Sequence, residues 1–298
     1  MKTKPFNRAL LTAIDNIVRF VSLLLVTLTI LLWVSISQVS GNTRNADAIP
    51  ILLYHNLING SGVVNSANID VNTFKKQMQY LHNNGYTTIT PEQLKMWING
   101  TLQLPPKSVM ITFDDGYESV YTLAYPILKQ YGFKATVFVI TRSIADYGNH
   151  VNFPHMSWAQ MQKASDVFTY GSHTDSLHYV KHGASYLFYV DTANIIADLI
   201  KSRKILNNTL YFAYPYGGYD SRIISAVKKA GYSMAWTTQE RYVYIGNSLH
   251  AIPRFTIDAD MDRFIEVVTG KAHPKIPPGF TEPPKRVNYH RMNLVACI

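Results

Sequence analysis

The sequence contains a single cysteine, Cys297, so an internal disulfide is excluded and the cysteine content indicates no particular cellular compartment. No glycine-rich phosphate loop opens any expected helix, which leaves a dinucleotide-binding fold without support. Acidic residues are scarce: the chain has 19 Asp and Glu against 28 Lys and Arg, which gives it a formal charge of +9. The basic surplus lies mainly at the two ends, residues 1–19 and 271–298. Such a distribution lacks the concentrated basic patch of a nucleic-acid-binding protein and suits an anionic membrane or wall surface, or simple solubility.

Residues 20–37 form a run of 18 residues without a charged side chain. That length lets a helix cross most of the hydrocarbon core of a bilayer. Basic residues precede the run within residues 1–19, so the positive-inside rule predicts a cytoplasmic N-terminus, a single-pass membrane anchor and an extracellular body. The alternatives are a cleaved signal peptide, which would give a secreted, surface-associated protein, and a buried globular helix. Residues 38–48 are polar and are expected to be a linker.

The rest of the chain alternates short apolar runs with amphipathic stretches. This alternation predicts an α/β fold, and its extent over residues 49–270 fits a distorted (β/α)7–8 barrel, with a doubly wound open sheet as the alternative. Residues 271–298 are proline-rich and nonperiodic, and are expected to form a flexible tail. Strands are expected at 51–54, 87–90, 109–113, 136–140, 168–171, 210–214, 233–237 and 252–257, and helices at 71–83, 91–98, 118–130, 157–164, 191–206, 220–230 and 260–268.

Polar residues gather directly after several of these apolar runs. His55 follows the first run, Asp114 and Asp115 follow the third, and a segment containing His173 and His178 follows the fifth. Because the active site of a βα barrel lies at the carboxyl ends of its strands, these side chains are expected to converge. Each motif alone has an ordinary alternative, since Asp-Asp-Gly is a common turn and loop histidines usually lie on the surface.

One carboxylate and two imidazoles, from Asp115, His173 and His178, make a set that can hold a catalytic metal ion with coordination positions left open. Such an ion would activate a water molecule and polarise a carbonyl oxygen. Neighbouring side chains at a strand end point in different directions, so Asp114 could accept the proton of the water while His55 protonates a leaving amine. We expect Zn²⁺, although Co²⁺, Ni²⁺ and Fe²⁺ fit the same ligands.

Three motifs resemble those of the polysaccharide deacetylase family, also called carbohydrate esterase family 4 or the NodB-homology domain. They are Thr-Phe-Asp-Asp-Gly at 112–116, Ser-His-Thr at 172–174 followed by His178, and Ala-Tyr-Pro-Tyr-Gly at 213–217. The resemblance covers residues 49–268 and implies a NodB-type barrel and a metal-dependent hydrolase that removes N-acetyl groups from a polysaccharide. The resemblance implies the same base, metal ligands and acid as the positions of these residues after the expected strands.

Two departures from the family pattern narrow this resemblance. His178 lies five residues after His173 rather than four, and the candidate acid, His55, comes from the first strand rather than from a motif near the C-terminus. This arrangement resembles the poly-β-1,6-N-acetylglucosamine N-deacetylases of the intercellular adhesin type, and so implies an extracellular biofilm polymer as substrate. Deacetylation of peptidoglycan or chitin, and non-catalytic polysaccharide binding, are the alternatives. We expect the protein to be monomeric.

The resemblance also implies roles for the motif around Pro215. The backbone N–H of Tyr216 would stabilise the oxyanion, and both Tyr216 and Pro215 would contact the substrate. Where the family usually has an arginine that orients the base, this chain has Ala213, and Arg254 is the candidate replacement.

Three further features lie near the expected site. Asp258 is the candidate for orienting His55. Trp236 is expected either to line the sugar groove or to lie in the core. The aromatic residues within 185–190 would form an exposed patch if they are not simply buried.

Overall fold

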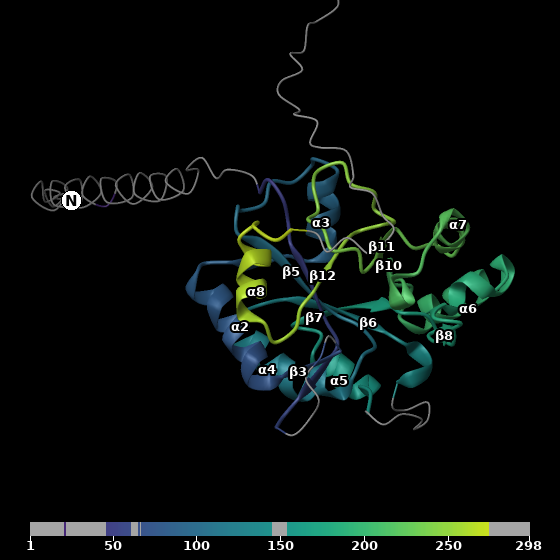
Figure 1. Ribbon diagram of the computed structural model, residues 1–298, viewed down its shortest axis with the longest axis horizontal. Helices are drawn as coiled ribbons and strands as arrows, with labels where there is room; N and C mark the ends of the chain where they lie inside the picture. The colour runs from purple at the N-terminus through teal and green to yellow at the C-terminus, as the bar shows by residue number, and fades with distance from the viewer. Residues whose placement is uncertain (1–20, 22–45, 61–64, 66, 145–153, 274–298) are drawn as a thin grey trace, which may run out of the picture. The chain divides into compact units, whose positions relative to one another are not determined.

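A compact unit begins at Ala46 in the computed structural model of the chain (Figure 1). The residues that the structure describes are Val21, 46–60, 65, 67–144 and 154–273. Within these ranges, no helix has both the length and the hydropathy to cross a bilayer. Apart from Val21, the predicted anchor at 20–37 lies outside the described residues, as do the basic N-terminus and most of the linker and tail, so these predictions stay predictions.

Eight parallel strands form the main sheet: β1 (Ile51–Tyr54), β4 (Thr87–Thr88), β5 (Ser108–Phe113), β6 (Ala135–Val139), β7 (Phe168–Ser172), β10 (Tyr211–Ala213), β11 (Met234–Trp236) and β12 (Phe255–Thr256). Their order is β11-β10-β7-β6-β5-β1-β12, with β4 pairing β5 beside this path. Ile252, just before β12, bridges Trp236 of β11, so the two edges of the sheet meet there. The sheet is therefore a barrel that is only partly closed, and the predicted α/β class is confirmed.

Helices cover the outside of this sheet: α2 (Val71–Asn83), α3 (Pro91–Ile98), α4 (Tyr125–Gln130), α5 (Trp158–Lys163), α6 (Thr192–Ile205), α7 (Ser221–Lys229) and α8 (Met261–Val268). Figure 1 shows α2, α4 and α8 on one side of the strands and α6 and α7 on the other. Side-chain caps start most of them, as when Asp70 accepts from the first N–H groups of α2 and Thr90 forms a capping box on α3. The sequence prediction gave α2 and α3 with the observed bounds.

Short elements occupy the connections, and these were not predicted. The helix expected at 118–130 is divided between a π-helical turn, η1 (Val120–Ala124), and α4. The remaining short elements are β2 (Asn56–Ile58), β3 (Asn68–Asp70), β8 (Val180–Lys181), β9 (Ala184–Ser185), η2 (Thr141–Ser143), η4 (Tyr186–Tyr189) and η5 (Pro215–Gly217). They matter because η2, β8, β9, η4 and η5 all follow barrel strands at the carboxyl end.

Large apolar side chains fill the barrel, with Phe138 and Trp236 in contact at a ring-centroid distance of 5.1 Å. Gly171 on β7 leaves room for them, because a Cβ there would lie 2.5 Å from the Phe138 ring. Trp236 is 0% exposed, which corrects the expectation that it lines a sugar groove. Its position on β11 directs the indole into the core, which was the alternative.

Candidate active site

The predicted site residues meet at the carboxyl ends of the barrel strands. Asp114 and Asp115 follow β5, while His173 and His178 lie in the loop after β7. Beside them is a pocket of about 310 Å³. It is lined by Asp115, Tyr117, Ile140, Arg142, Ser143, His155, Asp175, Ser176, His178 and Tyr216.

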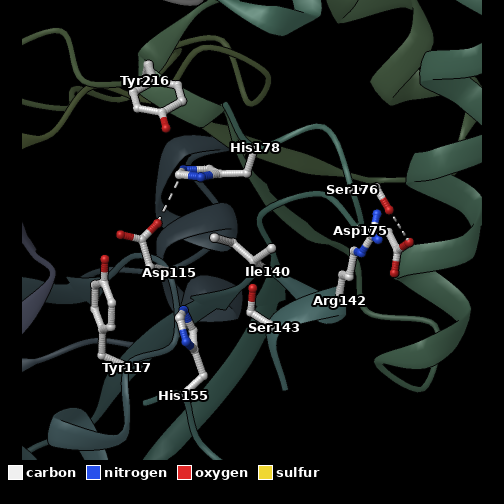
Figure 2. A pocket seen from close by; sticks show the side chains of 10 residues that line it. All are labelled: Asp115, Tyr117, Ile140, Arg142, Ser143, His155, Asp175, Ser176, His178 and Tyr216. Carbon is white, nitrogen blue, oxygen red and sulfur yellow. Dashed lines mark hydrogen bonds and ion pairs between the residues drawn. The ribbon is translucent and has the colours of Figure 1, made fainter. Parts of the chain in front are cut away.

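Figure 2 shows Asp115 facing His178, with Tyr216 on one side of the pair and Tyr117 and His155 on the other. His155 is only 6% exposed, and its ring lies 4.9 Å from that of Tyr117. Pro215, by contrast, is buried and is not among the residues that line this pocket, and its expected contact with substrate stays a prediction.

Asp115, His173 and His178 form a group that fits a metal ion. One potential ligand atom from each lies within 4.8 Å of the others. The Asp115 Oδ1 atom is buried without a hydrogen-bond partner, and it lies 3.3 Å from His178 Nε2 and 3.7 Å from His173 Nε2. A buried carboxylate oxygen normally needs a partner, and a cation between these three side chains would supply one.

The tautomer of His173 and the lowered pKa values of both histidines suit metal binding. The Nδ1 atom of His173 lies 2.8 Å from the carbonyl oxygen of Ala213, which can only accept, so Nδ1–H donates and Nε2 keeps its lone pair. Burial lowers the pKa of His173 to about 4 and the pKa of His178 to about 4. Both imidazoles are therefore neutral near pH 7, as metal ligands must be.

Backbone strain is concentrated around this group. Asp115, Thr174 and Tyr216 have φ values of 70°, 73° and 56°, in the left-handed region that side-chain-bearing residues rarely adopt. Each such residue costs about 1–3 kcal/mol and persists only when its surroundings fix it. At Asp115 the turn directs the carboxylate towards the histidines and separates it from that of Asp114.

Asp114 is held by the fully buried Arg254. The guanidinium donates to both carboxylate oxygens, with Nη1–Oδ1 at 2.7 Å and Nη2–Oδ2 at 2.8 Å. Its Nε–H donates to the Thr237 carbonyl at 2.9 Å. Burial raises the pKa of Asp114, but the charges of Arg254 and His173 and the arginine hydrogen bonds outweigh this effect and lower it to about 2. The contact predicted for Arg254 is therefore present.

His55 lies after β1, close enough to Asp114 and His178 to influence the pKa of each through its charge. Its Nδ1 atom is buried without a hydrogen-bond partner. The predicted contact with Asp258 is not formed; Asp258 Oδ1 accepts instead from the Asp260 N–H, and its carbonyl accepts from Gln77. His55 can thus still take a hydrogen bond from, or give one to, a molecule in the site.

Tyr216 lies in the η5 turn, where its ring stacks on His178 with centroids 4.7 Å apart and an interplanar angle of 27°. The next residue must be glycine, because Gly217 has a φ of 67° and a Cβ there would lie 2.0 Å from the Thr238 hydroxyl. The turn thereby fixes both the ring and the backbone of Tyr216 beside the metal-binding group.

Helix α6 anchors the loop that carries the two histidines, a feature that sequence analysis missed. The Asp198 carboxylate accepts from the backbone N–H groups of Asp175 at 2.9 Å and Ser176 at 2.8 Å. The Asp175 carboxylate is itself 2% exposed and accepts from Lys201 at 2.6 Å and from Thr141 at 2.8 Å. These bonds hold the middle of the loop between His173 and His178.

We predict that Asp198→Ala weakens metal binding by about ten- to a hundred-fold, the usual effect of losing a residue that orients ligands. Asp198→Asn keeps one acceptor oxygen, so its loss should be smaller. Competition with a chelator of known affinity measures both. Asp262→Ala, at an exposed acidic position on α8, is the matched control. Unchanged metal affinity together with a lower unfolding midpoint of the metal-free protein would reduce Asp198 to a structural role.

Comparisons with known proteins agree with this arrangement. The profile of the polysaccharide deacetylase family matches residues 101–235. YxkH of Bacillus subtilis, which carries the name of a polysaccharide deacetylase, is 32% identical over 225 residues, covering 74% of this chain and 75% of that protein. The poly-β-1,6-N-acetyl-D-glucosamine N-deacetylase of Staphylococcus epidermidis is 32% identical over 222 residues, covering 71% and 75%.

Solved structures give the same result. IcaB from Ammonifex degensii superposes with a TM-score of 0.67 at 27% identity, over 76% of this chain and 99% of that one. The deacetylase PplD of Streptococcus pyogenes gives a TM-score of 0.63 at 26% identity, over 74% and 98%. The fold, the motifs and these relatives together establish that the chain belongs to the polysaccharide deacetylase family and is an enzyme of that class.

Proposed function

We propose that the enzyme removes N-acetyl groups from an extracellular amino-sugar polymer, poly-β-1,6-N-acetyl-D-glucosamine of a biofilm matrix. The observation that carries the proposal is the Asp115, His173 and His178 group beside an arginine-held Asp114. The linkage of the polymer is supported by the relative from Staphylococcus epidermidis, whose name gives that substrate, and by the position of His55 after the first strand.

Asp115, His173 and His178 hold the metal ion in this proposal, and Zn²⁺, which catalytic sites bind through one carboxylate and two imidazoles, is the proposed ion. When bound, a divalent ion polarises the acetamide carbonyl and makes a water molecule more acidic. The chain's own contribution is to supply neutral imidazoles and an otherwise unpaired carboxylate oxygen.

The remaining residues move protons and stabilise charge. Asp114 accepts a proton from the attacking water while the water oxygen forms a bond to the acetamide carbon. Arg254 keeps the Asp114 carboxylate aligned. The Tyr216 N–H donates to the carbonyl oxygen as negative charge develops there. His55 then gives a proton to the sugar nitrogen while the C–N bond breaks, which leaves acetate and a free amine.

We propose a membrane location for this reaction, with residues 20–37 as a single-pass anchor and the catalytic unit outside the cell. The uncharged run and the basic residues before it support this orientation. A cleaved signal peptide remains the alternative and would leave the chemistry unchanged.

Acetate release from defined oligomers tests the proposed substrate. We expect faster release from β-1,6-linked than from β-1,4-linked N-acetylglucosamine oligomers, with loss of activity in chelator and recovery on adding Zn²⁺. A preference for the β-1,4 linkage would instead favour peptidoglycan or chitin. No release with any added divalent metal would contradict the proposal and favour a binding protein.

Substitutions of the two adjacent aspartates should have different effects on metal binding and on turnover. We predict that Asp115→Asn loses metal affinity, whereas Asp114→Asn keeps the metal and lowers kcat by about 10²- to 10⁴-fold, the usual contribution of a general base. Bound metal per protein and kcat measured on the same samples give the comparison. Equal loss of metal in both variants would refute the division of roles.

Removing the Arg254 guanidinium should raise the pKa of Asp114. Arg254→Met leaves a buried carboxylate unpaired, which should cost about 3–5 kcal/mol of stability. The carboxylate then stays protonated to higher pH, so the acid limb of kcat/KM should shift upwards. Arg254→Lys keeps the charge but loses the two-point contact, so it should fold better and shift less. Full activity with an unshifted pH profile in Arg254→Lys and Arg254→Met would exclude the orienting role.

A further inference from the structure

Exposed apolar side chains cluster in one segment of the described chain. Tyr179, Val180, Phe188 and Tyr189 are 42%, 49%, 40% and 45% exposed, and we call this group the aromatic ridge. Together with Tyr216 they make up half of the large hydrophobic side chains that are exposed among the described residues. Exposed apolar side chains that gather in one segment are candidates for a binding surface. Within 185–190, simple burial is therefore wrong for Phe188 and Tyr189, and the alternative of an exposed patch holds for these two residues.

The backbone beneath the ridge is firmly held. Leu187, between the exposed residues, is 0% exposed and packs with the buried residues of α6 and α7. Arg222 of α7 donates to the carbonyls of Val190 at 2.6 Å, Leu187 at 3.0 Å and Phe188 at 3.3 Å. The rings thus stay exposed on a fixed support, so little ordering is needed when a ligand binds.

The ridge is continuous with the pocket. Tyr179 directly follows His178, which lines the pocket and stacks on Tyr216. The η5 turn packs closely against the segment below the ridge, because a Cβ on Gly218 would lie 2.4 Å from Ser185 Cβ and 3.0 Å from the Phe188 ring. A chain leaving the pocket past Tyr216 would therefore reach the ridge next.

The size of the pocket indicates what the ridge binds. A volume of about 310 Å³ lies at the small end of ligand sites, so the pocket accepts only a short piece of a polymer. Neighbouring sugar units must rest on the surface beside it. Aromatic rings offer rigid apolar faces on which the C–H faces of pyranose rings can pack while the hydroxyls stay in water.

We propose that the aromatic ridge is a binding subsite for the pyranose units that flank the unit in the pocket. This proposal rests on the proposed function and extends it, because it makes the enzyme selective for polymer length. Units on the ridge would add binding energy that short oligomers lack, and kcat/KM should rise as the oligomer is lengthened.

The test compares a ridge variant with a matched control over β-1,6-linked N-acetylglucosamine oligomers of increasing length. The ridge variant is Phe188→Ala with Tyr189→Ala, and the control is Tyr244→Ala with Ile245→Ala, whose side chains are 40% and 51% exposed elsewhere. The wild type and the control should show the same rise of kcat/KM with length. In the ridge variant the advantage of the longest oligomer should fall about three- to ten-fold, as expected for lost aromatic packing.

Two further measurements separate the possible failures. Calorimetric titration of the longest oligomer into metal-free protein reports ridge binding without catalysis, so absence of acetate release would refute the proposed function and leave the ridge testable. Vesicles containing anionic lipid test whether the ridge binds a membrane instead. The cation that would attract such lipid is Lys181, which lies 5.5 Å above the Tyr189 ring. Unchanged length preference and oligomer affinity in the ridge variant would overturn the proposal, and a selective loss of vesicle binding would assign the ridge to a membrane.

Discussion

The buried ion pair between Arg254 and Asp114 is the constraint on which the rest of the site depends. A guanidinium that is 0% exposed must find partners inside the protein, and it finds them in the two oxygens of Asp114 and the carbonyl of Thr237. The pair joins the end of β5 to the segment just before β12, where the barrel closes. With Asp114 fixed, the left-handed turn at Asp115 can only direct the second carboxylate elsewhere, towards the histidines.

This pair also limits the chemistry of Asp114. An arginine that holds both oxygens keeps the carboxylate ionised, and the pKa of about 2 makes it a weak base. The ion pair orients the Asp114 carboxylate but weakens it as a base, so in the proposed mechanism proton transfer to Asp114 requires a water that is already more acidic than bulk water. In the proposed mechanism the paired aspartates are therefore interdependent: Asp114 could act as a base only because Asp115 is placed to help hold a metal ion.

Much of this arrangement could be predicted from sequence because it rests on local rules. Strands buried on both faces read as apolar runs, as β5 does, and capping residues such as Asp70 and Thr90 set the starts of α2 and α3. The role of Asp198 could not be predicted, because its contacts with Asp175 and Ser176 depend on how α6 packs against the loop. The orientation of Trp236 was equally hidden, since strand alternation does not tell the inside of a barrel from a groove.

One device recurs around the site and explains how short, strained loops can be rigid. Asp198 holds backbone N–H groups of the histidine loop, Arg222 holds carbonyls below the aromatic ridge, and Arg254 holds the side chain of Asp114. Each charged group comes from outside the segment that it fixes, so the strain at Thr174 and Tyr216 is borne by the barrel and its helices rather than by the loops. At the described loops a polymer would accordingly meet a surface that is already formed, so these loops would discriminate between polymers by their shape.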